Sequence, residues 1–155
     1  MARHLASETR QQAAFSGPEE EAFLDLQRTA SLLSQAVGRE LKPHRLTPAQ
    51  YNTLRILRSA APAALTCGEI GDRLVGSGPD VTRLLDRLEA QGLVERLRDA
   101  GDRRIVRTRI TGRGAALAGR IEAPLATALR RLLGPLGRSR LRVLIELLQQ
   151  ARRQA

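Results

Sequence analysis

The chain has 155 residues, of which 42% are hydrophobic, and a formal net charge of +10 at pH 7. This length suits one domain with an added oligomerisation segment, and the apolar runs are too short to cross a bilayer, which excludes an integral membrane protein. The first residues do not form a secretory signal, and the single cysteine, Cys67, cannot make an internal disulfide. We therefore expect a cytoplasmic protein without a membrane partner.

The basic excess is uneven along the chain. Residues 1–46 are neutral, residues 47–111 carry eleven basic against eight acidic side chains, and residues 112–155 carry nine against two. Six arginines fall within residues 96–109. Such clustering favours a polyanionic partner through counterion release. With only two Phe and one Tyr, the chain lacks the aromatic platforms that single strands need, so double-stranded DNA is the favoured partner.

Residues 1–15 are polar and predict a flexible N-terminus. Ser16-Gly17-Pro18-Glu19 then has the pattern of a helix start, with a capping serine, an early proline and a glutamate three residues on. One apolar stripe follows at alternating spacings of three and four, ending before Lys42-Pro43: Phe23, Leu26, Ala30, Leu33, Val37 and Leu41. A small domain cannot cover this stripe, so residues 16–46 are interpreted as an N-terminal dimerisation helix.

Two capping boxes predict the next two helices. Thr47 with Gln50 opens a helix that ends near Ala60, and Thr66 with Glu69 opens a short one. The segment from residue 75 to 78 then predicts a turn, and residues 79–91 predict a helix with Val81, Leu84, Leu85 and Leu88 on its buried face. Together these elements indicate a helix-turn-helix.

Residues 93–98 and 104–111 predict two strands joined by an arginine-rich loop at 99–103. Thr111 then caps a long helix that breaks at residues 134–137, and a last helix follows. The expected fold class is mostly α with a small β-hairpin wing (α+β), a winged helix-turn-helix with a helical dimerisation region. The expected domains are residues 47–111 for DNA binding and residues 112–155 for C-terminal dimerisation helices.

The outer face of the helix at 79–91 predicts contacts with DNA. Arg83 can pair bidentately with guanine, Thr82 can touch a thymine methyl group or a phosphate, and Arg87 lies one turn later, toward the backbone. Ser77 can donate to a phosphate, and Pro79 shares the outer face.

Carboxylates lie among these groups. Asp80 and Asp86 are interpreted mainly as partners of arginines, with Asp86 holding the guanidinium of Arg83, although Asp80 could instead accept from a cytosine amine. The backbone amides near Asp80 can also face a phosphate.

The loop from Asp99 to Arg104 predicts a second DNA contact. An exposed Arg104 suits the narrow, negative minor groove, Arg103 lies beside it, and Asp102 can support the Arg104 side chain. The alternative is a solvated turn with a surface ion pair.

The runs LDRLEAQGLVER and GDRRIVRTRITGRG, with the D-x-R motif at Asp102-Arg103-Arg104 and LTPAQY at residues 46–51, resemble the MarR family of bacterial winged-helix regulators. The resemblance extends over about residues 19–150. It implies a homodimer with intertwined terminal helices on a pseudo-palindromic operator, with the 79–91 helix in the major groove and Arg104 in the minor groove. Members commonly repress transcription and release DNA when a small molecule binds or a cysteine is oxidised.

The resemblance places an effector pocket near His44, Arg45 and Tyr51, each of which also has an ordinary structural interpretation. Cys67 begins a short helix, where a thiol pKa can fall, so a redox regulator remains an alternative. A protein-interaction module on the same scaffold is another. The two histidines, at 4 and 44, have no metal-ligand spacing, and no nucleophile or phosphate-loop motif occurs. We expect no enzyme activity, no cofactor and no metal.

Overall fold

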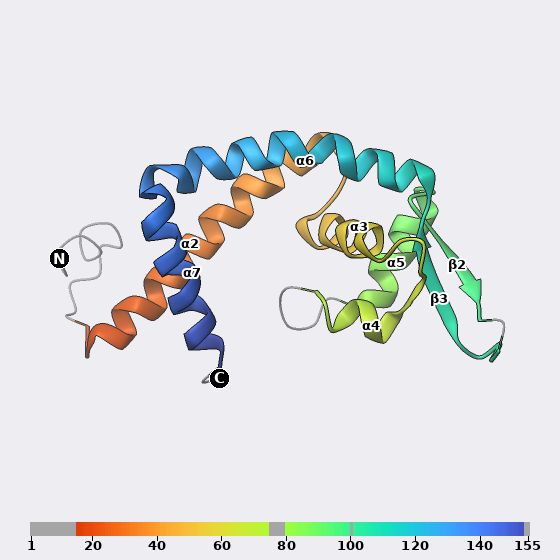
Figure 1. The fold of residues 1–155 in the computed structure, drawn as a ribbon, viewed down its shortest axis with the longest axis horizontal. Helices are drawn as coiled ribbons and strands as arrows, with labels where there is room; N and C mark the ends of the chain where they lie inside the picture. Colours follow the sequence, from red (N-terminus) through yellow and green to blue (C-terminus); the bar gives the residue numbers. More distant parts are fainter. Residues whose placement is uncertain (1–14, 75–79, 100, 154–155) are drawn as a thin grey trace. The chain divides into compact units, whose positions relative to one another are not determined.

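The computed structural model describes residues 15–74, 80–99 and 101–153 (Figure 1). Contacts divide the chain into two units, Met1–Ala36 and Val37–Ala155. In chain order the elements are α2 (Pro18–Leu41), η1 (Lys42–His44), α3 (Pro48–Ala60), β1 (Leu65–Thr66), α4 (Cys67–Gly71), α5 (Val81–Ala90), β2 (Val94–Arg98), β3 (Val106–Ile110), α6 (Gly112–Leu133), η2 (Gly134–Leu136) and α7 (Gly137–Arg153). The predicted class, mostly helical with a small sheet, is confirmed.

Both predicted capping boxes are present. At α3, Thr47 N–H donates to Gln50 Oε1 at 2.9 Å and Gln50 N–H donates to Thr47 Oγ1 at 3.2 Å. At α4, Thr66 N–H donates to Glu69 Oε2 at 2.7 Å and Glu69 N–H returns to Thr66 Oγ1 at 3.3 Å. The first amide groups of a helix have no carbonyl oxygen in a preceding turn to which they can donate. Each box supplies side-chain acceptors for them, which explains why these helices begin where they do.

Two predicted helix starts are wrong by small amounts. Glu20, not Glu19, reaches back to Ser16, because α2 begins at Pro18 and its third residue is Glu20; the carboxylate accepts from both the amide and hydroxyl of Ser16 at 2.7 Å. The helix expected from residue 79 begins at Val81, because the Asp80 side chain caps it. Pro79 lies outside the described residues.

The sheet has the order β1-β3-β2, and β3 runs antiparallel to both neighbours. Leu65 on β1 and Arg96 on β2 both pair with Thr108. β3 begins two residues later than predicted, at Val106. The amide of Arg104 donates to Asp102 Oδ1 and the amide of Ile105 donates to the carbonyl group of Asp102, so both residues belong to the turn. Figure 1 shows β2 and β3 extending as a hairpin beyond the helices that support them.

One hydrophobic core holds α3, α4, α5, the sheet and α6 together. Its fully buried side chains come from all of these elements and include Leu54, Leu57, Ile70, Leu85, Leu88, Leu93 and Ile121. Their helical members recur at spacings of three and four, which the sequence predicts for faces turned inward. Among the described residues, no helix is both long enough and apolar enough to cross a membrane.

The hairpin is fastened to α6 through Thr111. Its hydroxyl donates to Gly92 O at 2.8 Å and accepts from Gly114 N–H at 3.0 Å, while its own amide donates to Leu93 O at 3.1 Å. This closeness requires glycine at position 114, because a Cβ there would lie 2.0 Å from Leu93 O. Gly92 has φ +66, a left-handed conformation that suits glycine.

Gly114→Ala should destabilise the protein by roughly 3 kcal/mol, because the added methyl group forces α6 away from the backbone at Leu93. Gly112→Ala is the matched control, since a Cβ at that position meets nothing within 4 Å. Chemical denaturation of both variants measures the difference. Equal midpoints would show that the contact between α6 and Leu93 is looser than described.

Candidate nucleic-acid interface

α5 separates its side chains onto two faces. Leu84, Leu85 and Leu88 are buried, whereas Thr82, Arg83 and Arg87 are exposed. The buried leucines recur at helical spacing, so the polar and cationic groups between them must face outward. The side chains predicted to contact DNA from α5 are therefore all accessible. Ser77 lies outside the described residues.

Asp80 contacts both the backbone and the side chain of Arg83 at the start of α5. Its Oδ1 accepts from Arg83 N–H at 3.1 Å, and its Oδ2 lies 3.1 Å from Arg83 Nε. One carboxylate thus caps α5 and restrains the guanidinium, which is the pairing role predicted for Asp80. Both side chains remain more than half exposed, at 81% for Arg83 and 53% for Asp80, so the pair is weak and can open toward a ligand.

The prediction that Asp86 holds Arg83 is wrong. Asp86 Oδ1 lies 2.7 Å from Nη1 of Arg96, which comes from β2. Arg96 also approaches Glu89 Oε2 at 3.5 Å and donates to Thr82 O at 3.2 Å. Its amide donates to Glu89 Oε1 at 3.1 Å. A single arginine therefore clamps the candidate recognition helix to the hairpin.

The sequence reasoning missed Arg96 because the residue sits in a run of basic side chains that resembles a solvated strand. A signal was available. Asp86 and Glu89 are three residues apart on α5, so both carboxylates lie on one side of the helix, and the basic hairpin follows directly. At 25% exposure, the Arg96 side chain is better covered than the other arginines of this surface.

A second missed residue, Arg107, orders the loop. Its Nε lies 2.5 Å from Asp99 Oδ2, and its Nη1 lies 3.6 Å from Glu69 Oε2 on α4. Asp99 Oδ1 also accepts from the amides of Gly101 at 2.9 Å and Asp102 at 3.3 Å. The Arg107 hydrogen bond, followed by these two amides, lowers the pKa of Asp99. The loop is therefore tied both to itself and to the helix-turn-helix.

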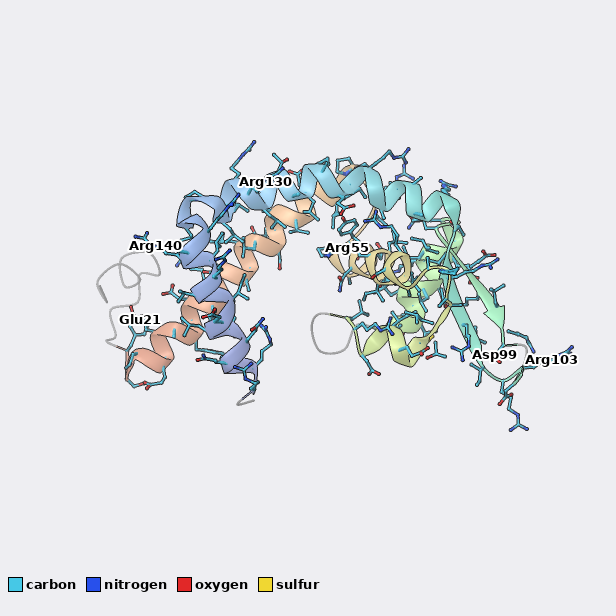
Figure 2. All side chains as sticks on the ribbon, in the orientation of Figure 1. Glu21, Arg55, Asp99, Arg103, Arg130 and Arg140 are labelled. Atoms are coloured by element: carbon cyan, nitrogen blue, oxygen red, sulfur yellow. The ribbon has the colours of Figure 1, made fainter. Side chains whose placement is uncertain are left out.

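Asp102 acts on the backbone and not, as predicted, on the Arg104 side chain. Its Oδ1 accepts from Arg104 N–H at 2.9 Å. Arg103 and Arg104 are exposed, and within the described part of the chain neither guanidinium has an ion-pair partner. Figure 2 shows Arg103 at the far end of the hairpin, pointing away from the helices. The loop thus holds two charges ready for a ligand.

The first turn of α3 borders the same surface. A hollow of about 240 Å³ lies between it and α5, lined by Thr47, Ala49, Gln50, Asp80, Arg83, Leu84 and Arg87. Helix N-termini carry a partial positive charge, which favours an anion nearby. The start of α3 is thus a further candidate phosphate contact that the sequence reasoning did not name.

The structure leaves the effector pocket predicted near His44, Arg45 and Tyr51 untested. Tyr51 is a core residue of α3, and burial raises the pKa of its phenol. His44 is half-buried in η1, and Arg45 is exposed with φ 55. None of the three lines the hollows beside α3, the sheet or α5.

Cys67 is the first residue of α4. Its thiol is half-buried and packs against the hydrophobic core. Nothing in this placement tests its predicted redox role. Within the described residues, no group of three or more His, Cys, Asp or Glu side chains could hold a metal ion.

Arg96→Ala should lower the free energy of unfolding by on the order of 2 kcal/mol, because three acceptors lose a charged donor at once. It should also weaken DNA binding, since Asp86 and Glu89 would then face the phosphates unpaired. Arg109→Ala is the matched control. Arg109 makes one exposed cross-strand pair, with Glu95 at 2.7 Å, so its loss should cost about 0.5 kcal/mol. Urea denaturation of both variants measures the contrast, and equal losses would contradict the clamp.

The depressed pKa of Asp99 predicts when the loop loses order. A carboxylate whose folded pKa is lowered contributes stability that is complete above its unfolded pKa, about 3.9, and is lost as the pH falls through the folded value. Carbon NMR should give an Asp99 midpoint below that of an unfolded aspartate. In Arg107→Gln the midpoint should rise toward the unfolded value. An unchanged midpoint in this variant would mean that Arg107 does not hold the loop.

Comparison with known proteins places this geometry in a family. The MarR family model matches residues 45–105. The regulator PecS of Dickeya dadantii, an HTH-type transcriptional regulator, is 31% identical over 111 residues, which cover 71% of this chain and 67% of PecS. YkoM of Bacillus subtilis, named as an uncharacterized HTH-type transcriptional regulator, is 30% identical over 105 residues, covering 65% of this chain and 67% of YkoM.

Solved structures agree with the relatives. The MarR transcription factor from Planctomyces limnophilus is 38% identical, with a TM-score of 0.68, and the match covers 88% of this chain and 98% of that one. The MepR–DNA complex of S. aureus shares the fold, with a TM-score of 0.78 at 23% identity over 86% of this chain and 97% of MepR. The chain therefore belongs to the MarR family and is a DNA-binding transcription regulator with a winged helix-turn-helix, not an enzyme.

Proposed function

We propose that this chain acts as a homodimer that binds a pseudo-palindromic operator, seating α5 in the major groove and the β2–β3 hairpin in the adjacent minor groove. The observation that carries the proposal is that the exposed face of α5 and the arginine-bearing hairpin are held by the same ion pair. Arg96 joins α5 to β2 through Asp86 at 2.7 Å, so the exposed face of the helix and the hairpin that carries the loop arginines are linked directly. Two contacts held at a fixed separation suit neighbouring grooves of one duplex.

In the major groove, α5 supplies distinct kinds of contact. Arg83 is the candidate for bidentate pairing with guanine, and Thr82 for a thymine methyl group or a phosphate. Arg87 lies one turn further on and suits the sugar-phosphate backbone. The weak pair between Asp80 and Arg83 keeps the guanidinium near the helix start until a base replaces the carboxylate.

In the minor groove, the hairpin loop supplies Arg103 and Arg104. Arg104 is the candidate for insertion, because narrow A·T-rich minor grooves have an enhanced negative potential that attracts arginine. Asp99 and Asp102 accept from backbone amides of the loop, which offsets part of their negative charge. The guanidinium groups are then the charges that the loop presents to DNA.

A second copy of the chain is the proposed partner, because large apolar side chains remain exposed on the terminal helices. On α2, Phe23, Leu26 and Leu32 are exposed; on α7, Val143, Ile145 and Leu147 are exposed. Apolar surface of this kind on a regulator is best covered by its own symmetric copy. A two-fold dimer reads a two-fold operator, with half-sites about one helical turn apart.

We further propose that the dimer represses transcription and that a small-molecule effector releases it. DNA binding by BpsR of Bordetella bronchiseptica, which shares the fold at 22% identity and a TM-score of 0.77, is regulated by 6-hydroxynicotinic acid. That ligand belongs to BpsR. For this chain we propose only that some small molecule binds the DNA-free form more tightly than the DNA-bound form and so shifts the population away from DNA.

Arg83→Ala and Arg104→Ala should each weaken operator binding by about 1–3 kcal/mol. Arg83→Ala should also relax base preference, while Arg104→Ala should reduce the preference for a narrow minor groove. Fluorescence anisotropy against operators varied at each position measures both effects. Arg142→Gln, an exposed arginine on α7, is the charge-matched control and should bind like wild type. If Arg83→Ala and Arg104→Ala both bind like that control, the contact assignments are wrong.

Sedimentation at micromolar concentration should show a dimer, and Leu147→Glu should shift it toward monomer by placing a charge on the exposed apolar face of α7. The same variant should bind a single half-site as before but lose tight binding to the full operator. A monomeric wild-type protein, or a Leu147→Glu variant that remains fully dimeric, would contradict the proposed dimer surface.

A further inference from the structure

The long helix α6 carries a line of arginines that has no part in the proposed operator contacts. Arg113, Arg120 and Arg131 are separated by seven and eleven residues, which correspond to about two and about three turns of helix. Their side chains therefore leave α6 in the same direction, and all three residues are exposed. At a rise of ~1.5 Å per residue, the line is about 27 Å long. These three residues are called the arginine ridge.

No ion pair within the described part of the chain neutralises the arginine ridge. Its three guanidinium groups make neither an ion pair nor a side-chain hydrogen bond with residues 15–74, 80–99 or 101–153. Glu122 is the only acidic residue of α6, and it is engaged with α3, where Arg58 Nη2 lies 2.6 Å from Glu122 Oε2. The ridge therefore presents an extended positive potential to solvent.

The surface between these arginines has no large apolar side chain. Its exposed residues are small: Ala116, Gly119, Ala123, Pro124 and Thr127. Helices that lie in a membrane surface need large apolar side chains beside their basic ones, and stable protein interfaces centre on a desolvated anchor residue. The ridge offers neither, whereas the backbone of a nucleic acid requires only accessible positive charge. Duplex DNA is therefore the polyanion that this face fits best.

The arginine ridge is also separate from the residues proposed to read the operator. α6 begins at the base of the hairpin, where Thr111 caps it, whereas Arg104 belongs to the loop at the other end of the hairpin. Arg83 lies beside the first turn of α3, and Figure 1 shows α3 between α6 and α4. A duplex held by α5 and the hairpin loop therefore leaves the ridge open.

We propose that the arginine ridge binds the phosphate backbone of a second DNA duplex, without regard to its base sequence, while α5 and the hairpin hold the operator. Duplex DNA carries one negative charge per ~1.7 Å of its axis, so a duplex laid along the ridge offers phosphates to every arginine. One dimer then holds two segments of DNA together. This bridging rests on the proposed function, because it needs the operator on the other surface, whereas the backbone contact itself does not.

Capture of a second duplex tests the bridging. Operator DNA is fixed to beads, saturated with the full chain, and exposed to a labelled duplex of random sequence that lacks the operator. Wild-type protein should retain the labelled duplex. Arg113→Gln/Arg120→Gln/Arg131→Gln should retain roughly tenfold less or lower still, because three phosphate contacts are lost from each protomer.

The matched control removes the same number of charges from another helix. Arg138→Gln/Arg140→Gln/Arg142→Gln takes three exposed arginines from α7 and should retain the labelled duplex like wild type. Operator affinity, measured by anisotropy, should be unchanged in both triple variants. Sedimentation and denaturation midpoints show whether each variant is dimeric and folded.

Salt dependence tests the backbone contact without the operator. In the Arg83→Ala/Arg104→Ala background, anisotropy with the random duplex is measured at several salt concentrations. Removal of the ridge should make the slope of log affinity against log salt shallower by about one for each arginine that contacts a phosphate. Polyglutamate and vesicles of anionic phospholipid, added as competitors, stand for an acidic protein and for a membrane.

The inference is overturned if wild-type protein retains no labelled duplex, if the ridge variant retains as much as wild type, or if the α7 control loses as much as the ridge variant. It is also overturned if polyglutamate or the vesicles compete as well as unlabelled duplex. Tight operator binding without capture of a second duplex rejects the ridge alone. A ridge-dependent salt slope without any preference for operator over random DNA rejects the proposed function alone.

Discussion

The arrangement of this protein depends on the ion pairs that Arg96 makes across the α5–β2 junction. A recognition helix and a hairpin can read two grooves of one duplex only if their separation is constant, and hydrophobic packing alone permits some sliding. The Arg96 side chain contacts the carboxylates of Asp86 and Glu89 and the carbonyl oxygen of Thr82, so it joins β2 to α5 at three positions along the helix. Thr111 and Gly114 complete the framework by holding the same hairpin to α6.

The carboxylates on this surface have a common explanation. Acidic side chains near a phosphate backbone are unfavourable, yet Asp80, Asp86, Asp99 and Asp102 all lie on or beside the candidate interface. Each is engaged within the protein: Asp80 caps α5, Asp86 pairs with Arg96, and Asp99 and Asp102 accept from the amides of the loop. Their charge is therefore used to shape the surface, and the exposed guanidinium groups determine its potential.

Much of the fold follows from local patterns in the sequence. The capping boxes at Thr47 and Thr66 locate two helices, and the leucines of α5 identify its buried face and hence its exposed one. The errors also have local causes. The helix expected from residue 79 begins at Val81 because the Asp80 side chain caps it. At α2, which begins at Pro18, Glu20 and not Glu19 reaches back to Ser16.

The sequence by itself therefore determined the longer helices, the β2–β3 hairpin and the outward-facing candidates for DNA contact, because caps and periodicity depend on residues within a few positions of one another. The family followed from the resemblance of its motifs. Only the tertiary structure decided which carboxylate each arginine meets. Arg96 is ten residues from Asp86, and Arg58 is 64 from Glu122, so these pairs arise from strand register and helix packing.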